Sequence, residues 1–184
     1  MARRLLLALR RLSGAREGAA AVEFALIVPF LIILYMGTIE ISDLIAVDRR
    51  VTVISGAVGD LVARTDGTID TATTLTDYFK ASEGIIVPYS KTGLKQVITC
   101  VFVDSAGVTS VAWSRGYNGG TAKTAGQPYA LPTAMTDISR NNWVIVSDTS
   151  YSYKPLLGMV IKTAINLHRV SFYLPRYGQY IAIT

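Results

Sequence analysis

The feature that most constrains this chain is an apolar run near its N-terminus. No charged residue occurs between Phe24 and Ile39, and Glu23 is the only charge within residues 19–39. Twenty-one helical residues at 1.5 Å each span roughly 31 Å, about the thickness of the hydrocarbon core of a bilayer. Pro29 lies within the run, and proline is tolerated better in membrane helices than in soluble ones. The sequence therefore predicts a transmembrane helix over residues 19–41.

The net charge of +5 belongs almost entirely to the segment before this run. Residues 1–18 carry five arginines against Glu17, which leaves a net charge of only +1 on the rest of the chain. Arginines beside a transmembrane segment hold their end in the cytoplasm, so residues 42–184 are expected on the other side of the membrane. The balanced charge of these residues argues against nucleic-acid binding.

Three interpretations of residues 1–41 compete. A secretory signal peptide has an apolar core of 7–15 residues followed by a small-x-small cleavage site, whereas this core is longer and no convincing site follows it. A plain single-pass anchor explains the length and the arginines but gives no reason for Glu23. The third interpretation places a cleavage before the apolar run, after Gly18.

The third interpretation rests on a resemblance. The stretch GAAAVEF is similar to the processing site of class III, type IV pilin-like signals. More specifically, the first 45 residues resemble TadE/TadF-like minor pseudopilins of the tight-adherence (Tad, Flp-type) pilus. That family shows a basic leader, a G-A-x-x-V-E-F-A-L-x-x-P core and a G-x-x-E near the helix end. The matching residues are Gly18, Ala19, Val22, Glu23, Phe24, Ala25, Leu26, Pro29, Gly37 and Glu40.

This resemblance implies that a prepilin peptidase cuts between Gly18 and Ala19, which makes Glu23 the fifth residue of the mature chain. Pilins usually have phenylalanine directly after the cut, and this chain has alanine. The cut creates an α-amino group, and in a bundle of staggered helices Glu23 of one subunit can meet the amine of its neighbour. A paired charge is tolerated in a bilayer where an isolated one is costly. A hydrated glutamate at the membrane edge, without a partner, is the alternative.

The resemblance also implies location and partners. It predicts a bacterial inner-membrane protein with a cytoplasmic leader (1–18) and a periplasmic domain (42–184), either held in the membrane or incorporated into the pilus. The implied partners are the prepilin peptidase, other pilin-like subunits, Tad inner-membrane assembly proteins and the lipid bilayer. Neither nucleic acid nor a small-molecule substrate is expected.

Beyond the membrane, the sequence predicts an α+β body with a long N-terminal helix on a small antiparallel sheet. Apolar residues at helical spacing extend the first helix to about Arg64. A second short helix is expected over residues 71–83, and a long surface loop over 115–135. Strands are expected over residues 94–104, 108–114, 142–155 and 165–178, the first two as a hairpin. The helical seam comprises Leu44, Val47, Val51, Ile54, Val58 and Leu61.

Three features of the body leave alternatives. The helical seam packs either on the chain's own sheet, which we favour, or on a partner helix. The apolar segment PLLGMVI (155–161) is either a core loop or an exposed contact. Five tyrosines near the C-terminus form either an adhesive face or, as we favour, half-buried sheet positions; they are Tyr151, Tyr153, Tyr173, Tyr177 and Tyr180.

The sequence offers little chemistry. His168 is the only histidine and Cys100 the only cysteine, and both are expected to be structural. Neither metal-binding nor phosphate-binding motifs are present. We therefore expect a non-enzymatic protein without a cofactor. The rival hypotheses are an unprocessed single-pass protein with an extracytoplasmic binding or sensing domain, and an anchored hydrolase for which the sequence displays no active site.

Overall fold

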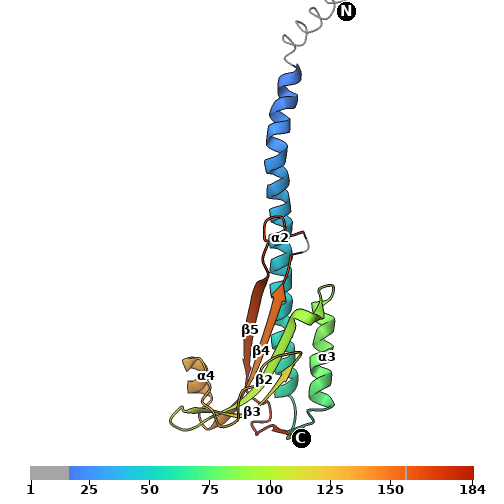
Figure 1. The fold of residues 1–184 in the computed structure, drawn as a ribbon. Helices are drawn as coiled ribbons and strands as arrows, with labels where there is room; N and C mark the ends of the chain where they lie inside the picture. The colour runs from blue at the N-terminus through green and yellow to red at the C-terminus, as the bar shows by residue number, and fades with distance from the viewer. Residues whose placement is uncertain (1–16, 156) are drawn as a thin grey trace, which may run out of the picture.

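A computed structural model describes residues 17–155 and 157–184 of the chain. Its dominant element is helix α2 (Glu17–Ala63), 47 residues long and continuous through Pro29. Its N-terminal half extends freely beyond the rest of the molecule, and its C-terminal half lies along a sheet (Figure 1). The helix ends one residue before the predicted boundary, at a turn in which Gly67 has a positive φ of 72°.

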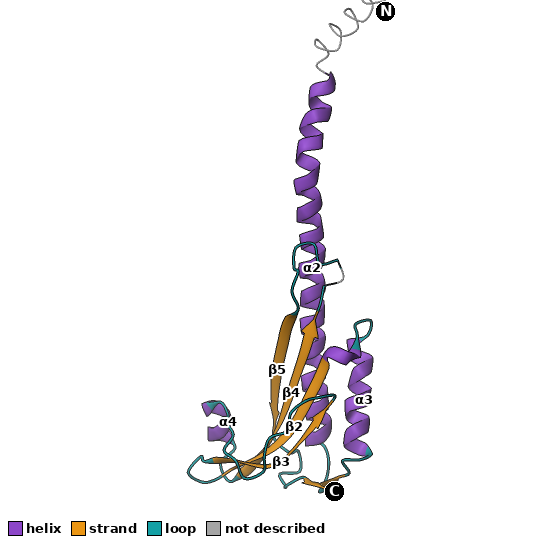
Figure 2. Ribbon diagram, viewed as in Figure 1, coloured by secondary structure: helices purple, strands orange, loops and turns teal. Residues whose placement is uncertain are grey.

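Four antiparallel strands form the sheet, in the order β3-β2-β4-β5. Strands β2 (Leu94–Val103) and β3 (Thr109–Tyr117) form the predicted hairpin. The two further predicted strands are β4 (Asn142–Tyr153) and β5 (Ile165–Tyr173), which end earlier than the predicted residues 155 and 178. Figure 2 shows the layers: α2 and α3 lie together on one side of the sheet. The α+β architecture predicted from the sequence is therefore confirmed.

The core lies between α2 and the sheet. The seam of α2 faces the chain's own body, as the sequence favoured: its four central members, Val47, Val51, Ile54 and Val58, are at most 1% exposed. Small residues between them let the backbones approach closely. Ser55 donates a hydrogen bond to the carbonyl oxygen of Ser147 (2.8 Å), and a Cβ at Gly59 would lie 2.8 Å from the Tyr173 ring. The small-residue row therefore serves contact with the sheet.

Helix α3 (Thr74–Ile86) begins three residues later than predicted. The side chain of Asp70 accepts hydrogen bonds from the backbone N–H groups of Ala72 and Thr73, so these residues form a turn before the helix. A carboxylate commonly forms such turns. The helix ends just before Val87, which is extended because Pro88 follows it.

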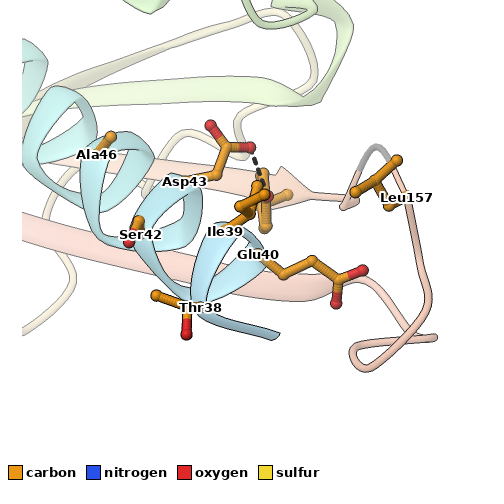
Figure 3. A pocket seen from close by; sticks show the side chains of 8 residues that line it. Thr38, Ile39, Glu40, Ser42, Asp43, Ala46 and Leu157 are labelled. Carbon is orange, nitrogen blue, oxygen red and sulfur yellow. Dashed lines mark hydrogen bonds between the residues drawn. The ribbon is translucent and has the colours of Figure 1, made fainter. Parts of the chain in front are cut away.

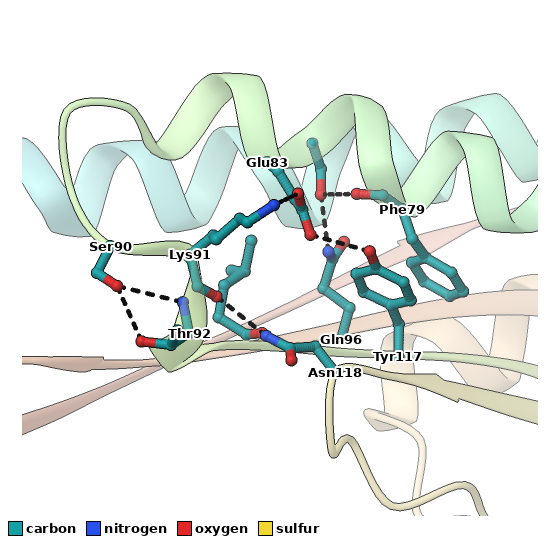
Figure 4. Close-up of polar contacts among 10 residues, drawn as sticks. Phe79, Glu83, Ser90, Lys91, Thr92, Gln96, Tyr117 and Asn118 are labelled. Atoms are coloured by element: carbon teal, nitrogen blue, oxygen red, sulfur yellow. Dashed lines mark hydrogen bonds and ion pairs between the residues drawn. The ribbon is translucent and has the colours of Figure 1, made fainter.

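Polar contacts join α3 to the hairpin (Figure 4). Glu83 accepts hydrogen bonds from Lys91, in the 3-10 helix η1 (Lys91–Gly93), and from the Tyr117 hydroxyl, both at 2.9 Å. These two donors lower the pKa of Glu83. The buried Gln96 side chain donates to Ser82 (2.7 Å). These contacts fix the orientation of α3 on the sheet.

The other sheet face carries a smaller apolar cluster of Val101, Val103, Val144 and Val146. Tyr129, Leu131 and Met135 pack against it. They belong to the long loop predicted over residues 115–135. Both ends of this loop differ from the prediction, because β3 continues to Tyr117 and helix α4 (Thr133–Ile138) begins at Thr133. The loop thus covers a second small core.

A two-stranded parallel sheet at the C-terminus was not anticipated from the sequence. It pairs β1 (Thr68–Ile69) with β6 (Ala182–Ile183). Two residues are too short to give a periodic signal, and the partners are more than a hundred residues apart. The adjacent Ile181 is 1% exposed, and its carbonyl oxygen accepts a hydrogen bond from Trp113 Nε1 (2.7 Å). The C-terminus therefore closes the end of the core.

Candidate functional site

The motif residues identified from the sequence all lie on α2, in two groups. Gly18, Ala19, Glu23, Phe24 and Pro29 occupy its free half, and every one of them is exposed. The apolar side chains in this half are exposed as well: Phe24 is 66% exposed and Phe30 is 75% exposed. A surface this apolar on a helix needs a non-aqueous partner. Within the described residues, α2 alone is long and apolar enough to cross a membrane.

Gly18 and Glu23 stand clear of the folded body. The position of a Cβ at Gly18 has no neighbouring side chain or distant backbone atom within 4 Å among the described residues. Among these residues Glu23 forms neither a hydrogen bond nor an ion pair. The arginines of the leader lie outside the described residues, and cleavage after Gly18 stays a prediction.

Gly37 and Glu40 form the second group, where α2 meets the body. Glu40 is only 2% exposed. Its carboxylate accepts hydrogen bonds from three successive backbone N–H groups of the β4–β5 loop: Met159 (2.7 Å), Val160 (3.2 Å) and Ile161 (2.7 Å). Successive N–H groups that converge in this way form an anion-binding concavity. The G-x-x-E motif therefore fastens the loop to the helix.

Gly37 lies against the loop. A methyl group at Gly37 would lie 3.4 Å from Cγ2 of Val160, an ordinary contact distance, so only a side chain larger than alanine would push against the loop. Gly158, at the tip of the loop, has a positive φ of 61°, which glycine adopts without strain. These two glycines and Glu40 together shape the junction, and the sequence revealed only the two motif residues on the helix.

Asp43, one turn further along α2, binds the body a second time. Its two carboxylate oxygens accept hydrogen bonds from the hydroxyls of Tyr89 and Tyr153, the latter at 2.7 Å. Figure 3 shows one hydrogen bond of Asp43 as a dashed line. Burial and the neighbouring Asp43 raise the pKa of Tyr89 to about 12 and raise the pKa of Tyr153 as well. Both phenols therefore stay protonated as donors. No local sequence pattern reveals this contact, because its partners are 46 and 110 residues away from Asp43.

A pocket of about 540 Å³ opens between the helix and the loop. Figure 3 shows its lining, which includes Ile39, Glu40 and Asp43 from α2 and Leu157 from the loop. Both carboxylates at its edge already have hydrogen-bond partners in the chain. The pocket is thus a groove at the junction, with an apolar wall.

The candidate reactive residues are separated from one another. Cys100 is fully buried between the sheet and α2, and burial raises the pKa of its thiol to about 12. His168 lies on the opposite sheet face, largely exposed, where its Nε2 is 2.8 Å from Asp148 Oδ1. The described residues contain no group of three or more His, Cys, Asp or Glu side chains able to hold a metal ion. His168 and Asp148 form a cross-strand pair on the surface.

The C-terminal tyrosines do not share one face. Tyr151 and Tyr153 are buried, Tyr173 packs on Gly56 and Gly59 of α2, and Tyr177 and Tyr180 are exposed in the C-terminal segment. Within the segment 155–161, by contrast, Leu157, Met159 and Val160 are each about half exposed, whereas Pro155 is buried. Its apolar tip therefore lies on the surface rather than in the core.

Comparison with known proteins bears on the N-terminal half of this site. The family model described as "TadE-like protein" matches residues 18–53. No curated protein and no solved structure matches the chain significantly. The matched segment begins at Gly18, contains the whole free half of α2 and includes Gly37 and Glu40, and it confirms the resemblance inferred from the sequence. Residues 18–53 of this chain are therefore similar to TadE-like proteins, and they include an apolar N-terminal helix long enough to cross a membrane.

Proposed function

We propose that this protein is a minor pseudopilin of a Tad-type pilus. A prepilin peptidase removes its leader after Gly18, the helix anchors it in the bacterial inner membrane, and the α+β body stands in the periplasm. There it contacts other pilin-like subunits and Tad assembly proteins. Its proposed role is structural, without catalysis and without a cofactor.

One observation carries this proposal: the two halves of α2 are built for different environments. Residues 47–63 present a seam whose central members, Val47, Val51, Ile54 and Val58, are buried by the chain's own body to at most 1% exposure. Residues 18–39 are apolar on every side and are covered by almost nothing in the described chain. A helix that is apolar all round requires a lipid or protein surrounding. A single rigid helix can thus join a membrane or a filament core to a folded periplasmic body.

Glu23 supplies the proposed assembly contact. It is the only charged group on the free half beyond Gly18, and it lies five residues after Gly18. Cleavage would create a positive amine at Ala19, and the carboxylate of a staggered neighbour can pair with it. The pair lowers the cost of both charges in an apolar surrounding and favours one axial register.

The processing step is tested by the intact mass of the protein extracted from membranes of cells with and without the prepilin peptidase. We expect the mature chain to begin at Ala19 only when the peptidase is present. Retention of residues 1–18 in the presence of active peptidase would instead support the unprocessed single-pass protein with a binding or sensing domain.

The assembly contact is tested by Glu23→Ala. Removal of a charge lowers the free-energy cost of membrane insertion, so the variant should insert at least as well as the wild type. The number of assembled pili should nevertheless fall, because the contact between subunits is lost. Asp77→Ala is the matched control, since Asp77 is an exposed carboxylate on α3 far from the free half of α2. Normal piliation with Glu23→Ala would contradict the pairing.

A further inference from the structure

The β4–β5 loop exposes a small apolar surface beside the helix. Leu157, Met159 and Val160 are 50%, 52% and 46% exposed. Lys154 and Lys162 flank them on either side, and both are exposed. A short apolar tip between two lysines has the composition of segments that lie in the interface of a membrane.

The position of the loop along α2 is fixed by two contacts. Val160 lies against Gly37, and the carboxylate of Glu40 holds the N–H groups of residues 159–161. The loop is therefore level with residues 37–40. The uncharged run of α2 ends at this level, with Ile39. Figure 1 shows the loop beside α2 above the ends of β4 and β5, on the side of the free half.

This level coincides with the expected edge of the bilayer. A hydrocarbon core of about 30 Å takes up about 20 helical residues. Counted from Ala19, where the proposed mature chain begins, 20 residues end near Thr38. Insertion of the free half of α2 to this depth brings the apolar tip of the loop to the membrane boundary on the periplasmic side.

The backbone N–H groups at the tip of the loop already have hydrogen-bond acceptors within the chain, as an apolar surrounding requires. Backbone N–H groups without partners are costly in lipid, so segments that enter it must satisfy them internally. Glu40 provides acceptors for three successive N–H groups at the tip, and the carboxylate itself is buried by the loop.

We propose that this loop is a second membrane contact. Leu157, Met159 and Val160 enter the periplasmic leaflet beside α2, while Lys154 and Lys162 lie at the lipid phosphates. The occupant of the apolar surface is lipid, because the surface continues directly into the exposed apolar half of the helix. The inference rests on the proposed membrane anchoring, and it adds that the body is held to the membrane at two points, which limits its tilt about the helix.

The test measures depth with nitroxide labels in the full chain, reconstituted in vesicles of phosphatidylcholine and phosphatidylglycerol. Met159→Cys carries the label, Leu34→Cys is the control within the span, and Val108→Cys, in the β2–β3 turn, is the aqueous control. Val108 lies at the end of the sheet opposite to the loop. Val103, the last residue of β2 before the turn, pairs with Asn142 at the start of β4, whereas the loop follows the other end of β4. The wild type serves as a blank, since its only thiol, Cys100, is fully buried.

We expect the label at Met159 to be reached by oxygen in preference to a water-soluble nickel chelate, as at Leu34 and opposite to Val108. Leu157→Cys provides a second label position with the same expectation. If Leu34 is in lipid and Met159 behaves like Val108, the loop inference is wrong while the anchoring stands. An aqueous label at Leu34 would overturn both. An immobilised label at Met159 that neither reagent reaches would show a protein partner in place of lipid, and would also overturn the inference.

Discussion

Glu40 shows how one side chain can define a junction. It projects from the last turn of the predicted span, yet it is among the most buried polar residues of the chain. Its hydrogen bonds are made to backbone groups rather than to cations, so they hold the loop without requiring a particular side chain there. The same sequence feature, a carboxylate near an apolar run, has an entirely different environment at Glu23, which is exposed.

Glu40→Gln should loosen the loop. The amide presents one acceptor oxygen in place of two and has no charge, so at least one of the three N–H groups loses its partner. We expect hydrogen exchange at residues 159–161 to accelerate on the order of tenfold, as for the loss of one charge-assisted hydrogen bond. Glu23→Gln is the matched control on the same helix and should leave this exchange unchanged. Equal protection in both variants would contradict the proposed clamp.

At the scale of elements, the packing of α2 on the sheet depends on small residues. A Cβ at Gly59 would lie 2.8 Å from two carbon atoms of the Tyr173 ring and 3.0 Å from Cβ of Ser147. Glycine costs about 1 kcal/mol in a helix interior relative to alanine. The close approach of the sheet explains why the helix contains it here.

Gly59→Leu should therefore separate α2 from β4 and β5. We expect overpacking to destabilise the protein by about 1–3 kcal/mol. Gly84→Leu is the control, because Gly84 is also helical but the position of its Cβ has no neighbour within 4 Å. That variant should be neutral or more stable, since leucine is the better helix former. Urea unfolding of both variants in detergent makes the comparison, and equal stabilities would argue against the close contact.

The end of α2 is also tied to the C-terminal segment by charge. Asp60 bonds to Arg64, the residue directly after α2, and to Arg176 (2.6 Å), and these hydrogen bonds lower the pKa of Asp60. Because the pKa is lower in the folded state, the unfolded chain binds the proton more tightly. The stability that Asp60 contributes is thus present above the unfolded pKa of about 4 and is lost as the pH falls through the lower, folded value.

Asp60→Asn should accordingly be less stable than the wild type at pH 7, and the difference should shrink as the pH falls below about 4. Urea unfolding across this range measures it. When Asp60→Asn is already present, the further substitution Arg176→Gln should lower the free energy of unfolding only slightly, because the carboxylate that Arg176 binds has been removed. A difference between wild type and variant that stays constant with pH would contradict this account.

At the scale of the whole molecule, the two ends of the chain have opposite roles. The N-terminal half of α2 leaves the body, whereas the C-terminus returns to it beside the end of α2 (Figure 1). There Ile181 fills the end of the core, and β6 pairs with β1. The body is therefore closed at the end far from the free half of the helix.

Ile181→Ala should open this end. Truncation of a fully buried isoleucine is expected to cost about 2–5 kcal/mol. Ile138→Ala is the control, because Ile138 on α4 is 66% exposed and should change stability by less than about 0.5 kcal/mol. Thermal unfolding of the two variants in detergent tests the difference, and an Ile181→Ala variant as stable as the wild type would contradict the role of Ile181 in closing the core.

Much of this architecture could be predicted from local patterns. The apolar run, the 3–4 spacing of Val47, Val51 and Ile54, and the β-rich runs each depend on residues close together in the sequence. The start of α3 was predicted wrongly because Asp70 forms a local turn that competes with the helix. The partners of Glu40 and Asp43 could not be predicted, since they lie up to 121 residues away.

By itself, the sequence determined the apolar helix, its register of Gly18, Glu23 and Glu40, and the α+β class, because periodicity and charge act over a few residues. Only the tertiary structure decided that the seam of α2 is covered by the chain's own sheet and that Glu40 binds the β4–β5 loop. It also decided that the apolar tip of this loop lies level with the end of the uncharged run. These relations join distant segments, and they depend on how the chain packs rather than on which residues are neighbours.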